Sequence, residues 1–380
     1  MFNKGALVLF SIILLLSGLS FLTSLIHDTA DYLPAYSYLV FAIEGFAGSY
    51  LFYIVFLRRL CLNKVIRAII NISVFQSVII VLMFFFEPLR EFIFALVETD
   101  SAGIVERYGG FRGLGLSSSL TYDLSVFLSI SMIFIVYLIA KGERNYFLYS
   151  FYWILLFIAV LMTGRSGYIG VVLSLFFVVI LVFQKNMIKW AVTFFLSFFI
   201  IGFAGTMLMK SMMPGKLEVV KQSVIPYAFE FFINFSEDGA LTTASIQKLN
   251  EMYFDVSSKT FFLGDGYWDD PVDDASYKST DAGYMRHLLF YGFFPSFILY
   301  AFYLLGFFII YKSIKDGLKE QLLIGFIASI FFIIHYKGDF LMGSSMNIKL
   351  FCILLLFSFL KNQSNEQIHE NFIPGKHLEE

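Results

Sequence analysis

Ten long apolar blocks interrupt this 380-residue chain, and they constrain its fold more than any other feature. Each block runs for about 17 to 25 residues, the length that an α-helix needs to cross roughly 30 Å of hydrocarbon. The blocks are 5–26, 36–56, 67–86, 120–140, 147–163, 167–184, 190–209, 285–311, 320–336 and 346–360. We therefore predict a polytopic membrane protein with about ten transmembrane helices.

A transmembrane β-barrel does not fit these blocks. Barrel strands alternate polar and apolar residues, whereas Ser125–Ala140 and Val171–Phe183 are continuously apolar. Hydrophobic residues make up 58% of the chain and charged residues 15%, which leaves too little for a large soluble domain. The prediction is an all-α fold in which residues 1–380 form a single membrane domain.

Lys and Arg residues in the short connections predict the orientation of the helices. With a cytoplasmic N-terminus, the short inside segments hold 14 basic residues and the short outside segments hold only Arg165, Lys337 and Lys349. Both termini are therefore expected in the cytoplasm. Residues 87–119 then form one external loop, and residues 210–284 form a larger one that carries short helices between spans seven and eight.

The composition argues against a nucleic-acid binder and against sites built from cysteine. A net charge of −2 does not suit a strongly basic nucleic-acid binder, so no nucleic-acid partner is expected. The two cysteines, Cys61 and Cys352, lie near or in different apolar blocks, so neither a disulfide framework nor a cysteine metal site is indicated.

The first external loop has the composition of an anion site. Four glycines fall within residues 109–115, and Arg107 and Arg112 lie beside them with three serines following. Glycines let a backbone turn and expose its N–H groups, and guanidinium and hydroxyl groups bind phosphate. The alternative is a flexible polar loop with arginines at the lipid headgroup level.

Arg165 lies in the very short connection between the fifth and sixth spans, within Thr163–Gly170. An arginine at this depth is costly unless it is paired or faces an aqueous cavity. It either binds a substrate anion or reaches up to lipid phosphate.

The large external loop contains segments suited to sugar binding. Leu217–Phe232 is apolar enough to lie on the membrane surface, and the stripe from Ile246 to Val256 predicts an amphipathic helix that serves as a lid or packs between helices. After these segments, Asp265, Tyr267 and Trp268 offer a carboxylate and aromatic faces for a pyranose ring. Pro271 interrupts the following aspartates, so they do not share the helical face that a magnesium box requires, and no metal site is predicted.

Asp281, Arg286 and His287 follow where the loop meets the eighth span. A polar triad at such a junction indicates function, although a capping aspartate and an interfacial arginine remain the alternative. Asp281 and His287 are the side chains of this triad that can act as a base, and Asp281 is favoured because it precedes the span and is freer to face water.

In these motifs and their order, the chain resembles the Wzy-type O-antigen and polysaccharide polymerases, within the group that also includes the O-antigen ligases. The motifs are Arg107–Gly110 with Arg112, Gly164–Ile169, Leu263–Tyr267, and Asp281–Tyr284 followed by Gly292. In the ligases an arginine-x-x-x-leucine element corresponds to Arg165–Ile169, with isoleucine here in place of leucine. The ligase histidine motif would begin at Asp281, whereas His287 comes six residues later, which favours polymerase over ligase.

The resemblance implies glycosyl transfer at the periplasmic face of a bacterial inner membrane, with undecaprenyl-pyrophosphate-linked oligosaccharides as donor and acceptor. Pyrophosphate is a good leaving group, so the enzyme needs mainly cations and one base, and no cofactor is expected. The arginines predicted to contact pyrophosphate are Arg165, Arg286, Arg112 and Arg107. Membrane lipid, a chain-length regulator and a flippase are the further partners expected.

Two other classes of function compete with this interpretation. A flippase or other transporter of lipid-linked oligosaccharide would use the same arginines to escort a pyrophosphate, but it does not explain an external loop of about 75 residues. A membrane interaction protein without chemistry is the third reading. Lengthening of glycans by purified protein in detergent separates the enzyme from the other two.

Overall fold

The structure is a computed structural model, and it describes residues 4–57, 60–97, 112–117, 121–181, 183, 185–238, 243–272, 275–313 and 317–371. Within these ranges the chain is helical, without strands, and Asp269 and Ser276 form an isolated β-bridge. Eight of the described helices are long and apolar enough to cross a membrane, and Arg165–Leu181 and Ser345–Ser358 are shorter apolar helices. The predicted all-α polytopic fold is confirmed.

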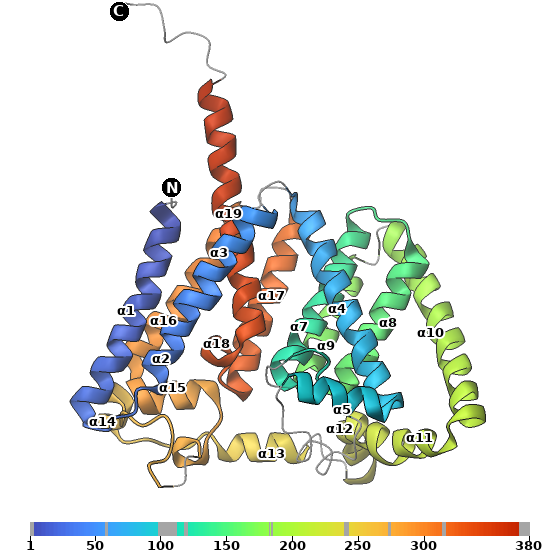
Figure 1. The fold of residues 1–380 in the computed structure, drawn as a ribbon, viewed down its shortest axis with the longest axis horizontal. Coiled ribbons are helices and arrows are strands. Elements are labelled where there is room, and N and C mark those ends of the chain that lie inside the picture. Colours follow the sequence, from blue (N-terminus) through green and yellow to red (C-terminus); the bar gives the residue numbers. More distant parts are fainter. Residues whose placement is uncertain are drawn as a thin grey trace, which may run out of the picture. The chain divides into compact units, whose positions relative to one another are not determined.

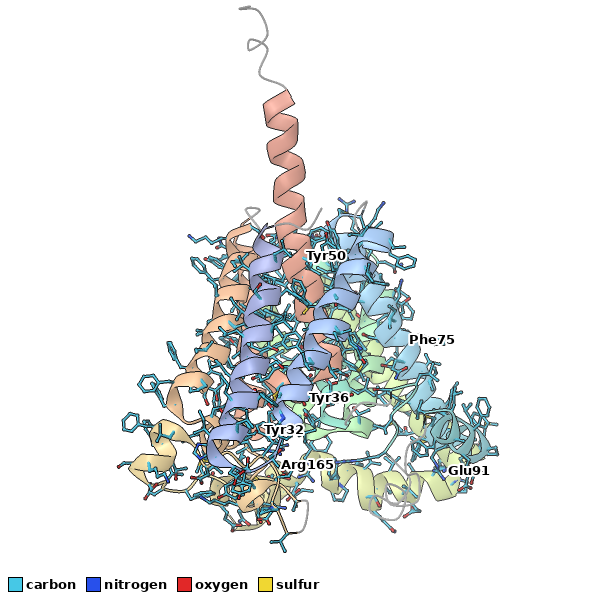
Figure 2. The ribbon with its side chains drawn as sticks, turned by 60° about the vertical axis from the view of Figure 1, so that its left-hand side comes forward. Tyr32, Tyr36, Tyr50, Phe75, Glu91 and Arg165 are labelled. Carbon is cyan, nitrogen blue, oxygen red and sulfur yellow. The ribbon has the colours of Figure 1, made fainter. Side chains whose placement is uncertain are left out.

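Many large apolar side chains of these helices point outward, as lipid-facing residues do. Figure 2 shows Phe75 on the outer side of its helix, where 60% of the residue is exposed. In a water-soluble protein such a surface would be covered, whereas in a bilayer it contacts lipid chains. The protein is therefore a multi-pass membrane protein.

Contacts within the chain divide it into two compact units, unit 1 with residues 1–62 and 252–380, and unit 2 with residues 63–251. The helices of unit 1 are α1 (Lys4–His27), α2 (Leu33–Val40), α3 (Gly48–Phe52), α14 (Ser258–Leu263), α15 (Gly283–Tyr291), α16 (Phe293–Ser313), α17 (Leu318–Lys337), α18 (Phe340–Gly343) and α19 (Ser345–Asn371). Two π-helical segments, Phe41–Ala47 and Tyr53–Leu57, join α2 and α3 into one span.

An aromatic core fixes the helices of unit 1. The ring of Phe351 on α19 lies 4.8 Å from that of Tyr303 and 5.0 Å from that of Phe307, both on α16. A side chain at Gly306 would collide with the Phe351 ring, so this glycine permits the close packing of α16 on α19. The Tyr303 hydroxyl also donates to the carbonyl of Leu341 at 2.5 Å, which ties α16 to α18.

The helices of unit 2 are α4 (Leu62–Phe85, its first residue still in unit 1), α5 (Glu87–Leu96), α7 (Thr121–Ala140), α8 (Tyr146–Thr163), α9 (Tyr168–Leu181), α10 (Lys185–Met212), α11 (Pro214–Val219), α12 (Ile225–Asp238) and α13 (Ala244–Glu251). A 3₁₀ turn, Arg165–Gly167, precedes α9, and a π-helical segment, Val220–Val224, links α11 to α12. Helix α7 is the buried core of this unit, and it packs against α8 and α9.

Two expected helices differ from the observed ones. The predicted eighth span, 285–311, is interrupted, because Gly292 adopts a φ of +76° that ends α15 and lets α16 start at Phe293. The amphipathic stripe to Val256 is helical only as far as Glu251. The segment 217–232 does form helices, with non-helical dihedral angles at Phe229 inside α12.

Candidate active-site residues

Arg286 lies where the large loop meets the membrane helices of unit 1, and contacts with Trp268 and Asp269 hold its guanidinium in place. Its guanidinium lies 4.2 Å from the centre of the Trp268 ring, and it donates to the Trp268 carbonyl at 3.0 Å and to the Asp269 carboxylate at 2.9 Å. The side chain is 14% exposed. An arginine that is stacked and bonded in this way is oriented before any ligand arrives.

Asp281 belongs to the same cluster through the loop 268–277. Its carboxylate accepts a hydrogen bond from the hydroxyl of Ser276, and Ser276 pairs by its backbone with Asp269, the ion-pair partner of Arg286. Asp281 itself is exposed. The structure thus brings together Asp281 and Arg286, as the sequence predicts, and leaves the carboxylate open to solvent.

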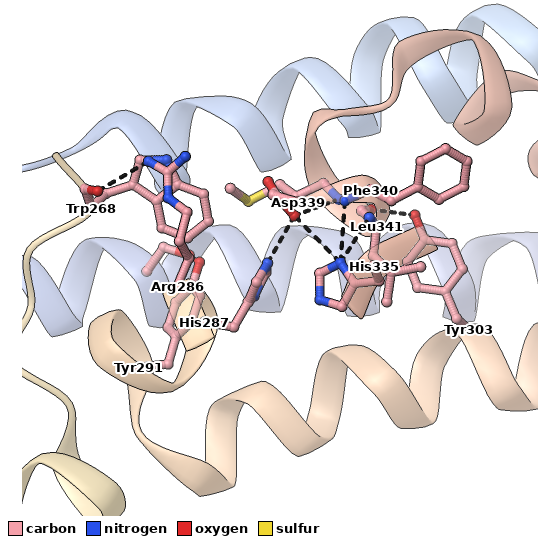
Figure 3. A network of polar contacts seen from close by, with 11 residues as sticks. Trp268, Arg286, His287, Tyr291, Tyr303, His335, Asp339, Phe340 and Leu341 are labelled. Atoms are coloured by element: carbon pink, nitrogen blue, oxygen red, sulfur yellow. Dashed lines mark hydrogen bonds and ion pairs between the residues drawn. The ribbon is translucent and has the colours of Figure 1, made fainter. Parts of the chain in front are cut away.

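His287 is fully buried beside Arg286, and its ring is oriented by Asp339. Its Nε2 lies 3.0 Å from an Asp339 carboxylate oxygen, as Figure 3 shows. The edge of the Trp268 ring covers the imidazole at 5.3 Å between ring centres. Nδ1 has no hydrogen-bond partner among the described residues, so it is the ring atom available for a proton.

Asp339 is held in the ionised form. Burial raises the pKa of its carboxyl, but the hydrogen bond from His287, together with the positive charge of Arg286, outweighs burial and leaves the pKa below its ordinary value. The carboxylate also accepts from the backbone N–H of Met342 at 3.3 Å, which caps α18. An aspartate that fixes one imidazole nitrogen while the other stays free is the arrangement that orients a general base.

His335 completes this buried group. Its Nδ1 accepts from the backbone N–H groups of Phe340 at 3.2 Å and Leu341 at 3.4 Å, so the ring is neutral and carries its proton on Nε2. His287, His335 and Asp339 have ligand atoms within 4.8 Å of one another, a composition that suits a metal ion. His335 Nδ1 already accepts these two N–H groups and His287 Nε2 is bound to Asp339, so we describe the cluster as a histidine–aspartate pair.

Sequence reasoning missed Asp339 and His335. They lie 52 and 48 residues after His287, beyond the region that the loop motifs cover. The available signal was a histidine and an aspartate four residues apart where an apolar block ends, since ionisable groups at that depth are unusual.

The residues predicted to bind sugar instead hold the loop together. Asp265 accepts hydrogen bonds from Thr260 at 2.8 Å, from Lys278 at 2.8 Å and from Tyr277 at 3.3 Å. Burial raises the pKa of its carboxyl, but these bonds outweigh burial and lower the pKa below its ordinary value. Tyr267 stacks on Tyr277 at 5.2 Å, and Trp268 is only 4% exposed. Neither Asp265 nor Trp268 offers a free group to a sugar unless the loop rearranges.

Arg165 begins the 3₁₀ turn that follows α8 in unit 2, and Figure 2 labels its side chain. Its guanidinium lies 3.8 Å from the centre of the Tyr227 ring and forms an ion pair with Glu230, both on α12. A side chain at Gly167 would collide with the backbone of Ser125 on α7, so this glycine lets the turn lie close to α7. The side chain of Arg165 is 17% exposed.

Arg112 is the second cation on Tyr227. It donates to the Tyr227 hydroxyl, and its guanidinium lies 5.1 Å from the ring centre. The structure therefore brings Arg112 to Arg165 within unit 2, and Asp281 to Arg286 and His287 within unit 1. Arg107 lies outside the described residues.

Comparison of the chain with protein-family models, with curated proteins and with solved structures finds no match. Function must therefore be argued from the two guanidinium sites and from the histidine–aspartate pair.

Proposed function

We propose that this protein is a glycosyltransferase that polymerises undecaprenyl-pyrophosphate-linked oligosaccharide repeat units into a surface polysaccharide. The observation that carries the proposal is the junction of α15, where an oriented guanidinium, an exposed carboxylate and an aspartate-bound imidazole lie within seven residues of one another, from Asp281 to His287. Such a set combines a cation for a leaving group with a base for an acceptor.

The chemistry needs little more than this set. As the bond between the anomeric carbon and the pyrophosphate oxygen breaks, negative charge grows on the leaving group, and a planar guanidinium neutralises it through two parallel hydrogen bonds. Arg286 is positioned for this role by Trp268 and Asp269. In unit 2, Arg165 and Arg112 form a second cationic site, where a pyrophosphate would replace Glu230 as the anion that pairs with Arg165.

The base takes the proton of the acceptor hydroxyl as the new glycosidic bond forms. Asp281 has direct access to solvent, and the Ser276 hydroxyl holds its carboxylate in place. His287 has the better-oriented ring, but Trp268 and its other neighbours bury it completely. Accessibility favours Asp281 as the base, with His287 as the alternative that requires Trp268 to move.

The active site is proposed to face the periplasm, with both termini in the cytoplasm. Within unit 1, the start of α1 and the C-terminal end of α19 lie at one end, and α14 and α15 lie at the other (Figure 1). The basic residues of the short connections support the cytoplasmic assignment of the termini.

This topology makes a first prediction. Reporters fused at Gly239 in the large loop and at Lys315 between α16 and α17 will report opposite compartments. A phosphatase that is active only in the periplasm should be active at Gly239, and a fluorescent protein that folds only in the cytoplasm should fluoresce at Lys315. The same compartment at both positions would contradict the topology.

The function is tested by gel analysis of surface polysaccharide in a strain that lacks the protein. Loss of long chains, with lipid that carries a single repeat unit retained, is the result expected for a polymerase. Loss of all capped lipid would instead indicate a ligase, and accumulation of repeat units on the cytoplasmic side would indicate a flippase.

The lowered pKa of the Asp339 carboxyl in the folded state predicts that the stability of the protein depends on pH. A carboxyl of this kind stabilises the fold above its unfolded pKa of about 4, and the stabilisation is lost as pH falls through the folded pKa. A hydrogen bond to a charged group contributes about 1.5–3 kcal/mol, so Asp339→Asn should lower the melting temperature at pH 7. The difference from wild type should shrink toward pH 3.

The matched control for this prediction is Asp255→Asn, since Asp255 is exposed. Thermal unfolding of the purified proteins in one detergent, measured at pH 7 and at pH 3, makes the comparison. A melting temperature for Asp339→Asn equal to that of the control at pH 7 would refute the structural role of the His287–Asp339 pair.

A further inference from the structure

Unit 2 contains an apolar groove that the proposed chemistry leaves unexplained. Its volume is about 740 Å³, and it lies among α4, α8, α10 and the segment from α11 to α12. Its lining includes Phe84, Phe157, Phe198, Met209 and Phe229. Phenylalanine and methionine present large, adaptable apolar surfaces, so the groove suits a long hydrocarbon chain.

The lining offers no polar group to a ligand, so the occupant must be apolar along this length. Thr206 carries the hydroxyl among the lining side chains, and it donates within α10 to the carbonyls of Gly202 at 3.0 Å and Phe203 at 2.9 Å. A polar ligand group placed here would lose its hydrogen bonds to water without replacement.

Two glycines leave room in one wall of the groove. Gly202 and Gly205 both line it, and a Cβ atom built on either residue meets no other atom within 4 Å. Larger side chains at these positions would therefore enter the groove without disturbing the helix packing. The helix that carries them, α10, exposes most of its side chains, so the groove borders the lipid phase.

Cationic side chains lie at one end of the groove. Met162 lines it, accepts a hydrogen bond from the backbone of Gly113 at 3.3 Å, and precedes Arg165 by three residues. Phe229 also lines it, and the next residue, Glu230, is the ion-pair partner of Arg165. The ammonium of Lys216 lies 5.0 Å from the ring of Phe84.

We propose that this groove binds the isoprenoid chain of a polyprenyl pyrophosphate, with the pyrophosphate at the Arg165 end. An apolar groove with cations at one end complements a single lipid chain that ends in an anion, and the pair Arg165 and Arg112 matches a doubly charged pyrophosphate better than a zwitterionic headgroup. The inference rests on the proposed function, since it assigns the place of the lipid carrier.

Substitutions at the glycines test the groove directly. The variant Gly202→Leu/Gly205→Leu fills it, and Ala204→Leu is the matched control, because Ala204 lies between the two glycines on α10, is exposed and does not line the groove. Each purified protein is placed in phosphatidylcholine nanodiscs. Binding of undecaprenyl pyrophosphate without sugar, of geranyl pyrophosphate and of phosphatidic acid is then measured by native mass spectrometry.

The groove-filling variant should bind undecaprenyl pyrophosphate at least tenfold more weakly than wild type and bind geranyl pyrophosphate unchanged, while Ala204→Leu behaves as wild type. Equal binding of undecaprenyl pyrophosphate by wild type and the groove-filling variant would overturn the inference, as would binding of phosphatidic acid by wild type as tight as that of undecaprenyl pyrophosphate. The proposed function fails separately, because a protein that binds the lipid in this groove and never extends a glycan would contradict polymerisation alone.

Discussion

Asp281→Asn should lower the rate of chain extension by about a hundredfold or more, with normal expression and normal donor binding. Asparagine keeps the shape of the side chain and still accepts the hydrogen bond from Ser276, so the loop remains folded. It removes only the basic oxygen that would take the proton of the acceptor hydroxyl. The rate is measured as the growth of polymer from a purified lipid-linked repeat unit.

A neighbouring aspartate provides the control for this variant. The carboxylate of Asp270 lies on the same loop and accepts from the backbone of Val272 at 3.0 Å, so Asp270→Asn should extend chains at nearly the wild-type rate. Near-normal extension by Asp281→Asn would move the base to His287. The variant His287→Gln, together with the melting temperature of Asp339→Asn, would then test that alternative.

Arg286→Lys and Arg165→Lys should each lower extension by roughly tenfold to more than a hundredfold. A charge-assisted hydrogen bond contributes about 1.5–3 kcal/mol. Lysine keeps the positive charge, but its ammonium cannot donate the two parallel hydrogen bonds that a guanidinium donates. At position 286 lysine also cannot stack as a plane on Trp268, and at position 165 it cannot do so on Tyr227. The same polymer growth assay reports both variants.

Arg144→Lys is the control for these two variants, since Arg144 is exposed in the connection between α7 and α8. It should extend chains as wild type does. Wild-type rates for both Arg286→Lys and Arg165→Lys would show that neither guanidinium stabilises the leaving group.

The membrane helices were predictable because bilayer thickness fixes the length of an apolar block. The break at Gly292 was harder, since a glycine inside an apolar block is common and only its φ of +76° ends the helix. Hydropathy measures how apolar a segment is, and it carries no information on a single backbone dihedral angle.

The sequence predicted several residues of the candidate site, but it did not predict which residues they pair with. The sequence indicates Arg165, Arg286 and Asp281 because charges near an apolar block are unusual. Their partners come from other elements: Glu230 lies 65 residues after Arg165, and Asp339 lies 52 residues after His287. Such pairs depend on how helices pack, which the spacing of one segment does not encode.

The packing partners of the aromatic residues in the large loop were likewise not predictable from the sequence. Trp268 was predicted to stack on a sugar ring, because the face of an aromatic side chain can pack against a pyranose ring. In the folded loop its ring packs against Arg286, His287 and Phe290. Composition reveals which residues are able to stack, and the tertiary fold decides on what they stack.

The central claim is that the protein itself forms glycosidic bonds, and one measurement tests it most directly. Purified protein in detergent is given undecaprenyl-pyrophosphate-linked repeat units, without any membrane gradient, and the products are separated on a gel. A ladder of longer chains is expected with wild type and almost none with Asp281→Asn. Repeat units that remain single with well-folded wild-type protein would contradict the claim.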